Sequence, residues 1–323
     1  MSHAVETMMY TGDVPWHKLG VALPAAPTVE EGILAAGLDW EVGTKPLFTS
    51  DNEKVTHQAT YRKTDGKILG VVGPTYKPLQ NKEAFNFFNP FLESGAASLE
   101  TAGSLHEGGR VWVLAKINKE DSVIVPKSND TIKKYILLCN SHDGTLAIRV
   151  GFTPVRTVCQ NTLNMALNDK ASKLIRIRHT GDIVGNLDKV SEIMDAANAQ
   201  FEATAEQFRR MANTEINRAD LEKYVRIVFA TKKQEEEALL SGEELTSGNR
   251  VMESVTKMFE HGRGNDMPGV KGTLWAAYNA VAEYVQYERG NDTATRLDNL
   301  WFGTGAGLNK KALVTALSMV KSA

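Results

Sequence analysis

Side chains capable of binding or proton transfer concentrate in one stretch of the chain, from Leu137 to Thr180. Between Gly144 and His179 it carries six lysines or arginines against one acid, Asp169, although the whole chain has a formal charge of only -2. A local excess of positive charge in a near-neutral protein favours an anion-binding surface. The residues of interest are His142, Asp143, Arg149, Arg156, Cys159, Gln160, Asn161, Lys173, Arg176, Arg178 and His179.

The arginines fall on predicted strands. From Thr145 to Thr153 the apolar residues alternate with Arg149, which places this arginine on the open face of the strand. The same alternation in KLIRIRH directs Ile175 and Ile177 inward and Arg176 and Arg178 outward. Two such arginines stand about 7 Å apart, near the spacing of successive phosphates in an extended nucleic acid. The alternative is a set of surface salt bridges with acids of the helical half, such as Asp182 or Glu192.

The segment TVCQNTLNMAL reads as a strand end that turns into a helix near Cys159 to Thr162. Amide groups at a helix start attract anions, and Gln160 and Asn161 carry groups that hydrogen-bond a base edge or a sugar. Alternatively, Asn161 or Thr162 only caps the helix. In the binding hypothesis the phosphate contacts are Arg149, Arg156, Lys173, Arg176 and Arg178, and the sugar or base contacts are Gln160, Asn161 and His179.

The sequence His142-Asp143-Gly144 admits two interpretations. Asp-Gly is typical of a hairpin turn, whereas a metal-dependent hydrolase or nuclease would use His142, Asp143 and His179 as ligands or proton carriers. A metal site needs further ligands at suitable spacing, and a Cys159 nucleophile would need a third orienting group. The turn is the stronger interpretation, so we expect a non-enzymatic protein with no catalytic residue, metal ion or cofactor.

Composition sets the protein class. The chain has 323 residues, 42% of them hydrophobic and 24% charged, which is ordinary for a folded globular protein and excludes extended disorder. Cys139 and Cys159 are the only cysteines and lack the spacing of a disulfide framework or zinc site. The first residues lack a signal-peptide pattern, and no apolar run approaches the roughly 18 residues of a membrane span. We therefore expect a cytoplasmic protein with no membrane association.

Hydrophobic periodicity divides the chain near residue 180. The first part, residues 1–180, is predicted to be an α+β domain rich in β-hairpins with interspersed helices, and residues 181–323 a mainly helical domain. The first thirty residues are predicted to be loop because glycine and proline recur closely. Predicted strands cover 40–48, 55–62, 68–72, 97–105, 110–117 and 145–153; predicted helices cover 28–37, 79–92, 187–211, 220–230, 249–259, 273–287 and 309–320.

Several segments resemble a phage- and plasmid-encoded family of unknown function catalogued as family 932. They are PWHKLG, YRKTDGKILGVVGPTYKPLQN, ETAGSL, GRVWVLAKI, NSHDGTLAIRVGFTPVRTVCQNTL, IRIRHTGDI, GTLWAAYNAVAEYVQYERG and LDNLWFGTGAGLNKKAL. They run in order through nearly the whole chain. The resemblance implies the company of mobile elements in a bacterial host, whose accessory proteins handle replication, recombination or defence.

The hairpin-and-helix architecture is also similar in outline to phage single-strand annealing proteins, which grip nucleic acid in a basic groove of an oligomer. This likeness implies a homo-oligomeric protein that binds single-stranded nucleic acid, with DNA favoured, in recombination. A structural or host-interaction protein that assembles through its helical half is the remaining alternative. Fold analogy alone does not establish function.

Overall fold

The computed structural model describes residues 5–12, 14–15, 18–118, 121–156, 175–245, 248–289, 299–300 and 303–320, with only the backbone described for 188–200. Its centre is an eight-stranded sheet in the order β11-β10-β9-β7-β6-β1-β2, with β8 pairing β9. All pairs are antiparallel except β1 with β2. The strands are β1 (Val5–Thr11), β2 (Val21–Leu23), β6 (Ala97–Leu105), β7 (Arg110–Ile117), β8 (Ser122–Val125), β9 (Asp130–Ser141), β10 (Ile148–Arg156) and β11 (Ile175–Ile177).

Both faces of the central sheet are apolar. On β7, Val111 and Val113 enter one hydrophobic cluster while Trp112 enters another on the opposite face. We call the first cluster the sheet core. Its other members include Leu138, Ile148, Val150 and Ile177 of the neighbouring strands, and α1, α2 and the start of α4 contribute to it. Continuous apolar runs such as VWVLA therefore reflect a strand buried on both sides.

The predicted α+β class is confirmed, and so is the hairpin formed by β6 and β7. The prediction that the first thirty residues are loop is wrong for Val5–Thr11 and Val21–Leu23, since β1 pairs with both β6 and β2. Glycine and proline cluster after Thr11, whereas β1 itself contains neither. Over the first thirty residues as a whole, glycine and proline are frequent enough to hide this one short strand.

Three short helices cover one face of the sheet: α1 (Val29–Ala35), α2 (Asn81–Asn86) and α3 (Asn89–Glu93). Thr28 begins α1 with a capping box, accepting from the Glu31 amide while the Glu31 carboxylate accepts from the Thr28 amide. The single helix predicted from Leu79 to Leu92 is instead α2 and α3. Pro90 lies at the start of α3, where its ring is tolerated, whereas in a continuous helix it would remove a backbone hydrogen bond.

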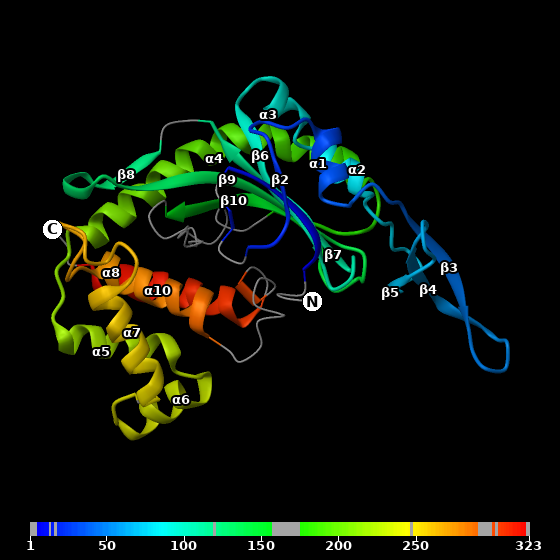
Figure 1. Cartoon of the computed structure of the whole chain (residues 1–323). Coiled ribbons are helices and arrows are strands. Elements are labelled where there is room, and N and C mark those ends of the chain that lie inside the picture. Colours follow the sequence, from blue (N-terminus) through cyan, green and yellow to red (C-terminus); the bar gives the residue numbers. More distant parts are fainter. Residues whose placement is uncertain are drawn as a thin grey trace.

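A separate three-stranded antiparallel sheet, which we call the arm, projects from the body (Figure 1). It consists of β3 (Val42–Phe48), β4 (Lys54–Arg62) and β5 (Ile68–Val72), so the three predicted strands are confirmed. The turn between β4 and β5 contains Gly66 at φ 73°, a left-handed conformation that glycine adopts without a steric penalty.

The arm meets the body where β5 crosses the turn after β9. A Cβ atom on Gly70 would lie 2.5 Å from Cα and 2.7 Å from the carbonyl oxygen of Asp143. Backbone atoms cannot move aside as a flexible side chain can, so Gly70→Ala is expected to lower the free energy of unfolding by about 1–3 kcal/mol. Urea denaturation measures the change. Gly73→Ala is the matched control, because a Cβ there meets nothing within 4 Å, and equal stability of the two variants would contradict the prediction.

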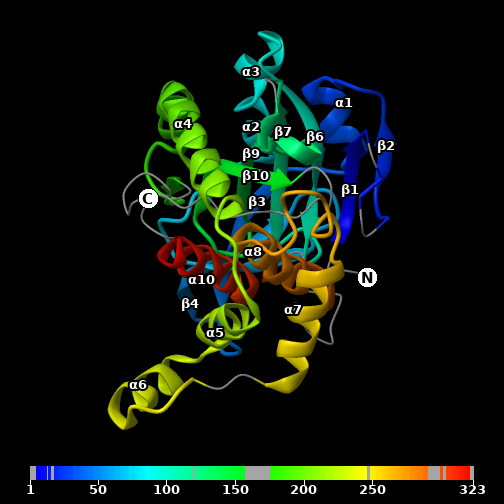
Figure 2. The same ribbon diagram turned by 90° about the vertical axis from the view of Figure 1, so that its left-hand side faces the viewer.

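The second half of the chain is helical, as predicted. Its elements are α4 (Ile183–Ala212), α5 (Arg218–Phe229), α6 (Lys232–Ser241), α7 (Asn249–His261), α8 (Leu274–Glu283), the π-helical η3 (Tyr284–Glu288) and α10 (Thr304–Met319). Figure 2 shows α5, α7, α8 and α10 grouped beside the sheet, with α4 running from the sheet to this group. No helix in the described part of the chain has the length and apolar content needed to cross a membrane.

The two halves are joined by a second large cluster, which we call the helical core. It contains Phe201, Phe208 and Trp275 together with Ile124 and Ile132 from β8 and β9. The start of α4 packs in the sheet core through Ile183 and Leu187, and its end packs in the helical core. The secondary structure therefore changes near residue 180, but both hydrophobic clusters contain residues from each half of the chain.

Candidate nucleic-acid interface

The edge of the central sheet gathers three of the predicted arginines. In the pairing of β10 with β11, Arg149 lies directly opposite Arg176, and Val150 lies opposite Ile175. Directly opposed residues of antiparallel strands project from the same face. Ile148 and Ile177 enter the sheet core, so the paired arginines occupy the other face. Arg176 and Arg178 are exposed, whereas Arg149 is half-buried.

The two exposed arginines are not paired with an acidic side chain of the described residues. Within the described part of the chain, neither Arg176 nor Arg178 forms an ion pair. Asp182, one of the acids considered as a partner, instead caps α4 by accepting from the Gly185 amide at 3.0 Å. The side chain of Glu192, the other, lies outside the described residues. Arg176 is the middle residue of β11, the strand at one end of the sheet order, and its side chain is exposed.

Next to this edge lies an open pocket of about 300 Å³. Arg178 and His179 approach it from the end of β11, Tyr76 from the loop after β5, and Thr145 from the turn between β9 and β10. Thr75, Thr180 and the backbones of Gly73 and Gly144 add small polar groups to its lining. The pocket therefore combines a guanidinium, hydroxyl groups and aromatic rings, which suits a phosphate with an attached sugar or base.

Tyr76 and His179 hold this wall of the pocket together. Their rings stack with centroids 4.5 Å apart. The Tyr76 hydroxyl donates to the Ser141 carbonyl, and the Lys77 amide donates to the His179 carbonyl at 2.7 Å. Burial lowers the pKa of His179, against the backbone groups of Lys77 and Leu146, which raise it. His179 thus lies at the predicted site, where its ring forms part of the pocket wall. Its lowered pKa favours the neutral imidazole.

Sequence reasoning missed the pocket residues Thr75, Tyr76 and Thr180. Thr75 and Tyr76 are in the loop GPTYKP after β5, and nothing in the sequence indicates that this loop returns to β11, about a hundred residues later. Binding residues are found disproportionately on loops, and the position of Tyr76 in a loop was the one signal in the sequence that pointed to it. The pairing of Lys77 with His179, 102 residues apart, could not be read from local periodicity.

The second interpretation of the central stretch placed a metal or proton-transfer site at His142, Asp143 and His179. His142 is fully buried, and its Nε2 lies 2.9 Å from Oδ1 of Asn81. Its ring packs edge-on against Trp40 at 5.4 Å. Burial lowers the pKa of His142 to about 3. No group of three His, Cys, Asp or Glu side chains suited to a metal occurs among the residues that the structure describes.

Asp143 organises a turn. Its Oδ1 accepts from the Thr145 amide at 2.8 Å and from the Ser141 hydroxyl at 2.6 Å, and Gly144 has a φ of 76°. Arg110 lies 3.7 Å from the other carboxylate oxygen. The prediction that Asp143-Gly144 forms a turn is therefore confirmed.

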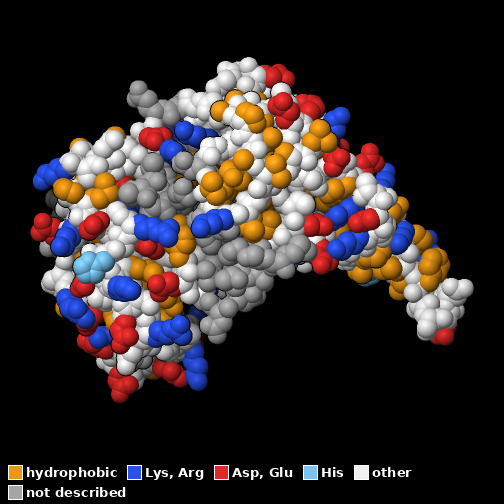
Figure 3. All heavy atoms as spheres, in the orientation of Figure 1, with side chains coloured by type: hydrophobic (Ala, Val, Ile, Leu, Met, Phe, Trp, Pro, Cys, Tyr) orange, Lys and Arg blue, Asp and Glu red, His pale blue; other side chains and the backbone are white. Residues whose placement is uncertain are grey.

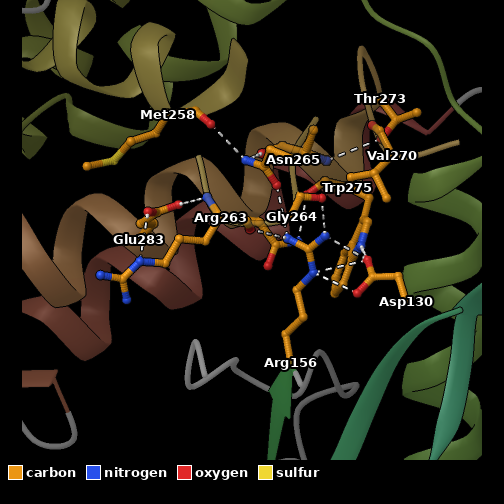
Figure 4. Close-up of polar contacts among 12 residues, drawn as sticks. Asp130, Arg156, Met258, Arg263, Gly264, Asn265, Val270, Thr273, Trp275 and Glu283 are labelled. Carbon is orange, nitrogen blue, oxygen red and sulfur yellow. Dashed lines mark hydrogen bonds and ion pairs between the residues drawn. The ribbon is translucent and has the colours of Figure 1, made fainter. Parts of the chain in front are cut away.

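Arg156 does not lie on an exposed face. Its side chain and that of Asp130 are both completely buried, with Nη2 2.7 Å from Oδ2 of Asp130 (Figure 4). The guanidinium also donates to the Gly264 carbonyl at 2.8 Å and to Oδ1 of Asn265 at 3.0 Å. Trp275 donates to the same carboxylate at 2.8 Å. The expectation of an exposed phosphate contact does not hold for Arg156, because protein groups surround its charge.

The continued alternation of β10 explains this placement. Counting from Ile148 and Val150, Arg156 falls on their face of the strand, opposite to Arg149, and it pairs with Ile132 of the helical core. The predicted strand ended at Thr153 and so left this position unassigned. The glycine-rich loop after α7, residues 262–272, supplies the carbonyl and amide acceptors.

Three further predicted site residues, Gln160, Asn161 and Lys173, lie outside the described residues. The structure thus brings together Arg149, Arg176, Arg178 and His179 at one edge of the sheet.

A model of the family described as a domain of unknown function, DUF932, matches residues 68–306, and the chain belongs to this family. No curated protein and no solved structure matches the chain.

Proposed function

We propose that this DUF932 protein binds single-stranded nucleic acid, DNA in preference to RNA, as a non-enzymatic accessory protein of a phage or plasmid. Annealing or recombination of single strands is the process we assign to it. The observation that carries the proposal is the edge of the sheet at β10 and β11. There Arg149 and Arg176 stand opposite each other and Arg178 lines a pocket beside them.

The positive charges suit a phosphate backbone in both number and spacing. Arg176 is in the edge strand β11 and Arg178 directly follows its last residue. An extended chain spaces two such residues about 7 Å apart, and each guanidinium offers a fork of donors to phosphate oxygens. Backbone contacts of this kind bind without sequence preference.

The pocket favours a single strand over a duplex. At about 300 Å³ it has room for part of one nucleotide, and only an unpaired nucleotide can turn into such a site. Tyr76 and His179 provide a ring surface, and Thr75, Thr145 and Thr180 provide hydroxyl groups for a sugar or base. Gln160, Asn161 and Lys173 remain proposed contacts. Arg156 is excluded from the interface because it is buried with Asp130.

The test is binding of a labelled oligothymidylate, followed by fluorescence anisotropy over a series of salt concentrations. Wild-type affinity is expected to fall steeply with salt, since each phosphate contact releases counterions. Arg176→Ala combined with Arg178→Ala is expected to weaken binding about 10–100-fold and to reduce the slope of log K against log salt by about 1.4.

The matched control removes the same charge elsewhere. Arg250 and Lys257 are exposed on α7, away from β11, and Arg250→Ala with Lys257→Ala is expected to leave the affinity close to that of the wild type. Absence of binding at low salt, or equal losses in the two double variants, would rule the proposal out. Competition with oligouridylate and with duplex DNA measures the preference for single-stranded DNA.

A further inference from the structure

The arm has one face toward the body and one face away from it. Thr60 belongs to the inner face, where its hydroxyl donates to the His142 carbonyl at 2.6 Å. In the register of the arm, Lys45, Ala59 and Val71 lie opposite one another, as do Tyr61 and Ile68. Because side chains alternate along a strand, these residues and Val55 lie on the opposite, outer face.

The outer face of the arm is unusually apolar for a surface. Val55, Ile68 and Val71 are 38%, 47% and 58% exposed. The solvent face of an antiparallel sheet normally carries polar residues, and neighbouring exposed apolar side chains mark a surface that another element covers. Figure 3 shows hydrophobic side chains along the arm, with basic side chains among them. Lys45 lies on this face, its Nζ 5.0 Å from the centre of the Tyr61 ring.

A second exposed apolar surface is on α6. None of its ten residues is buried, and Leu239 and Leu240 are 86% and 89% exposed. A helix this short is marginal in water without tertiary packing. It is held by a capping box between Thr231 and Gln234 and by the ion pair of Glu235 with Lys311 at 2.6 Å. Together the two leucines form an exposed apolar patch on a helix that buries none of its residues.

The two surfaces complement each other in charge. Glu236 lies one turn before Leu240, and Glu243 follows shortly after it. Within the described part of the chain neither glutamate forms an ion pair, so α6 presents leucines flanked by negative charge. The arm presents valines and an isoleucine beside Lys45. Packing a helix across a sheet face is a common way to bury both.

These surfaces cannot meet within one molecule, because the arm and α6 stand at opposite sides of it (Figure 1). We propose that α6 of one copy docks on the outer face of the arm of the next copy. Leu239 and Leu240 then pack against Ile68 and Val71. Such a head-to-tail contact repeats from copy to copy and gives a closed ring or an open filament.

Sedimentation velocity over a range of protein concentrations tests the contact, with two variants that each remove one surface. Leu239→Gln with Leu240→Gln keeps good helix formers on α6, and Ile68→Thr with Val71→Thr keeps β-branched residues on the arm. The wild type is expected to assemble as its concentration rises. Each variant is expected to require at least about tenfold more protein to assemble.

Mixing the two variants separates a head-to-tail contact from others. The α6 variant retains an intact arm and the arm variant an intact α6, so an equimolar mixture is expected to form one-to-one pairs and nothing larger. Val314→Gln, at another exposed apolar residue, is the control and is expected to assemble as the wild type does. A wild type that stays monomeric, an α6 variant that assembles normally, or a mixture that fails to pair would overturn the proposal. Circular dichroism confirms that each variant is folded.

Discussion

Replacing Arg156 with methionine is expected to lower the free energy of unfolding by about 3–5 kcal/mol, measured by urea denaturation. The change removes the positive charge that neutralises the completely buried Asp130. It also leaves the Gly264 carbonyl and Oδ1 of Asn265 without their donor. Water cannot solvate an isolated carboxylate in this position. Removing only the arginine therefore destabilises the protein by more than the intact ion pair stabilises it.

Three companion variants sharpen this prediction. Arg156→Lys keeps the charge without the planar fork and is expected to cost less than Arg156→Met, which provides a measurement if the methionine variant does not fold. Arg156→Met with Asp130→Leu removes both charges and is expected to recover part of the loss. The matched control is Arg176→Met on the exposed edge, expected to change stability by about 0.5 kcal/mol or less. Unchanged stability of Arg156→Met would contradict the assignment of this pair.

The stability of the protein is expected to fall in mildly acidic solution because of His142. Its pKa is lowered from 6.5 to about 3 by burial, so the folded protein does not bind the proton that the unfolded chain takes up. The stabilisation is fully present above pH 6.5 and is lost as the pH falls from 6.5 toward about 3. The expected loss is about 2 kcal/mol between about pH 7 and about pH 5.

Urea denaturation at several pH values measures this effect. His179 contributes in the same direction, since burial lowers its pKa as well. His142→Gln is expected to be less stable at neutral pH and to show a shallower dependence on pH, because one proton uptake by the unfolded chain is removed. His261→Gln changes an exposed histidine and is the control, expected to follow the wild type. A His142→Gln variant with the full wild-type dependence would show that other groups cause the loss.

Strand alternation in the sequence predicted much of the sheet edge. It placed Ile148, Val150 and Ile177 in the core and Arg176 and Arg178 outside, as the structure does. Alternation depends only on neighbouring residues, so it works wherever the strand is correctly bounded. The sequence also predicted the helix over 28–37 and the strands on either side of Gly66, because the cap at Thr28 and the turn at Gly66 depend only on local hydrogen bonds and backbone conformation.

Other features depended on contacts distant in the sequence. Arg156 meets Asn265 across 109 residues and Trp275 meets Asp130 across 145, and no local pattern reports such meetings. Arginines 149 and 156 looked alike in the sequence, yet one is at the edge of the sheet and the other is enclosed by the glycine-rich loop. The pocket wall of Tyr76 and His179 arises in the same way, from a loop that returns to the strand edge.

The position of β1 within the sheet has a consequence for how the chain folds during synthesis. Val5 pairs with Leu105, so this strand leaves the ribosome long before its partner β6 exists. Until then β1 can pair only with β2, and closing so long a loop slows the step in which it joins β6. The edge of β1 that later pairs with β6 stays open during this interval, and an unpaired strand edge exposes a nascent chain to aggregation.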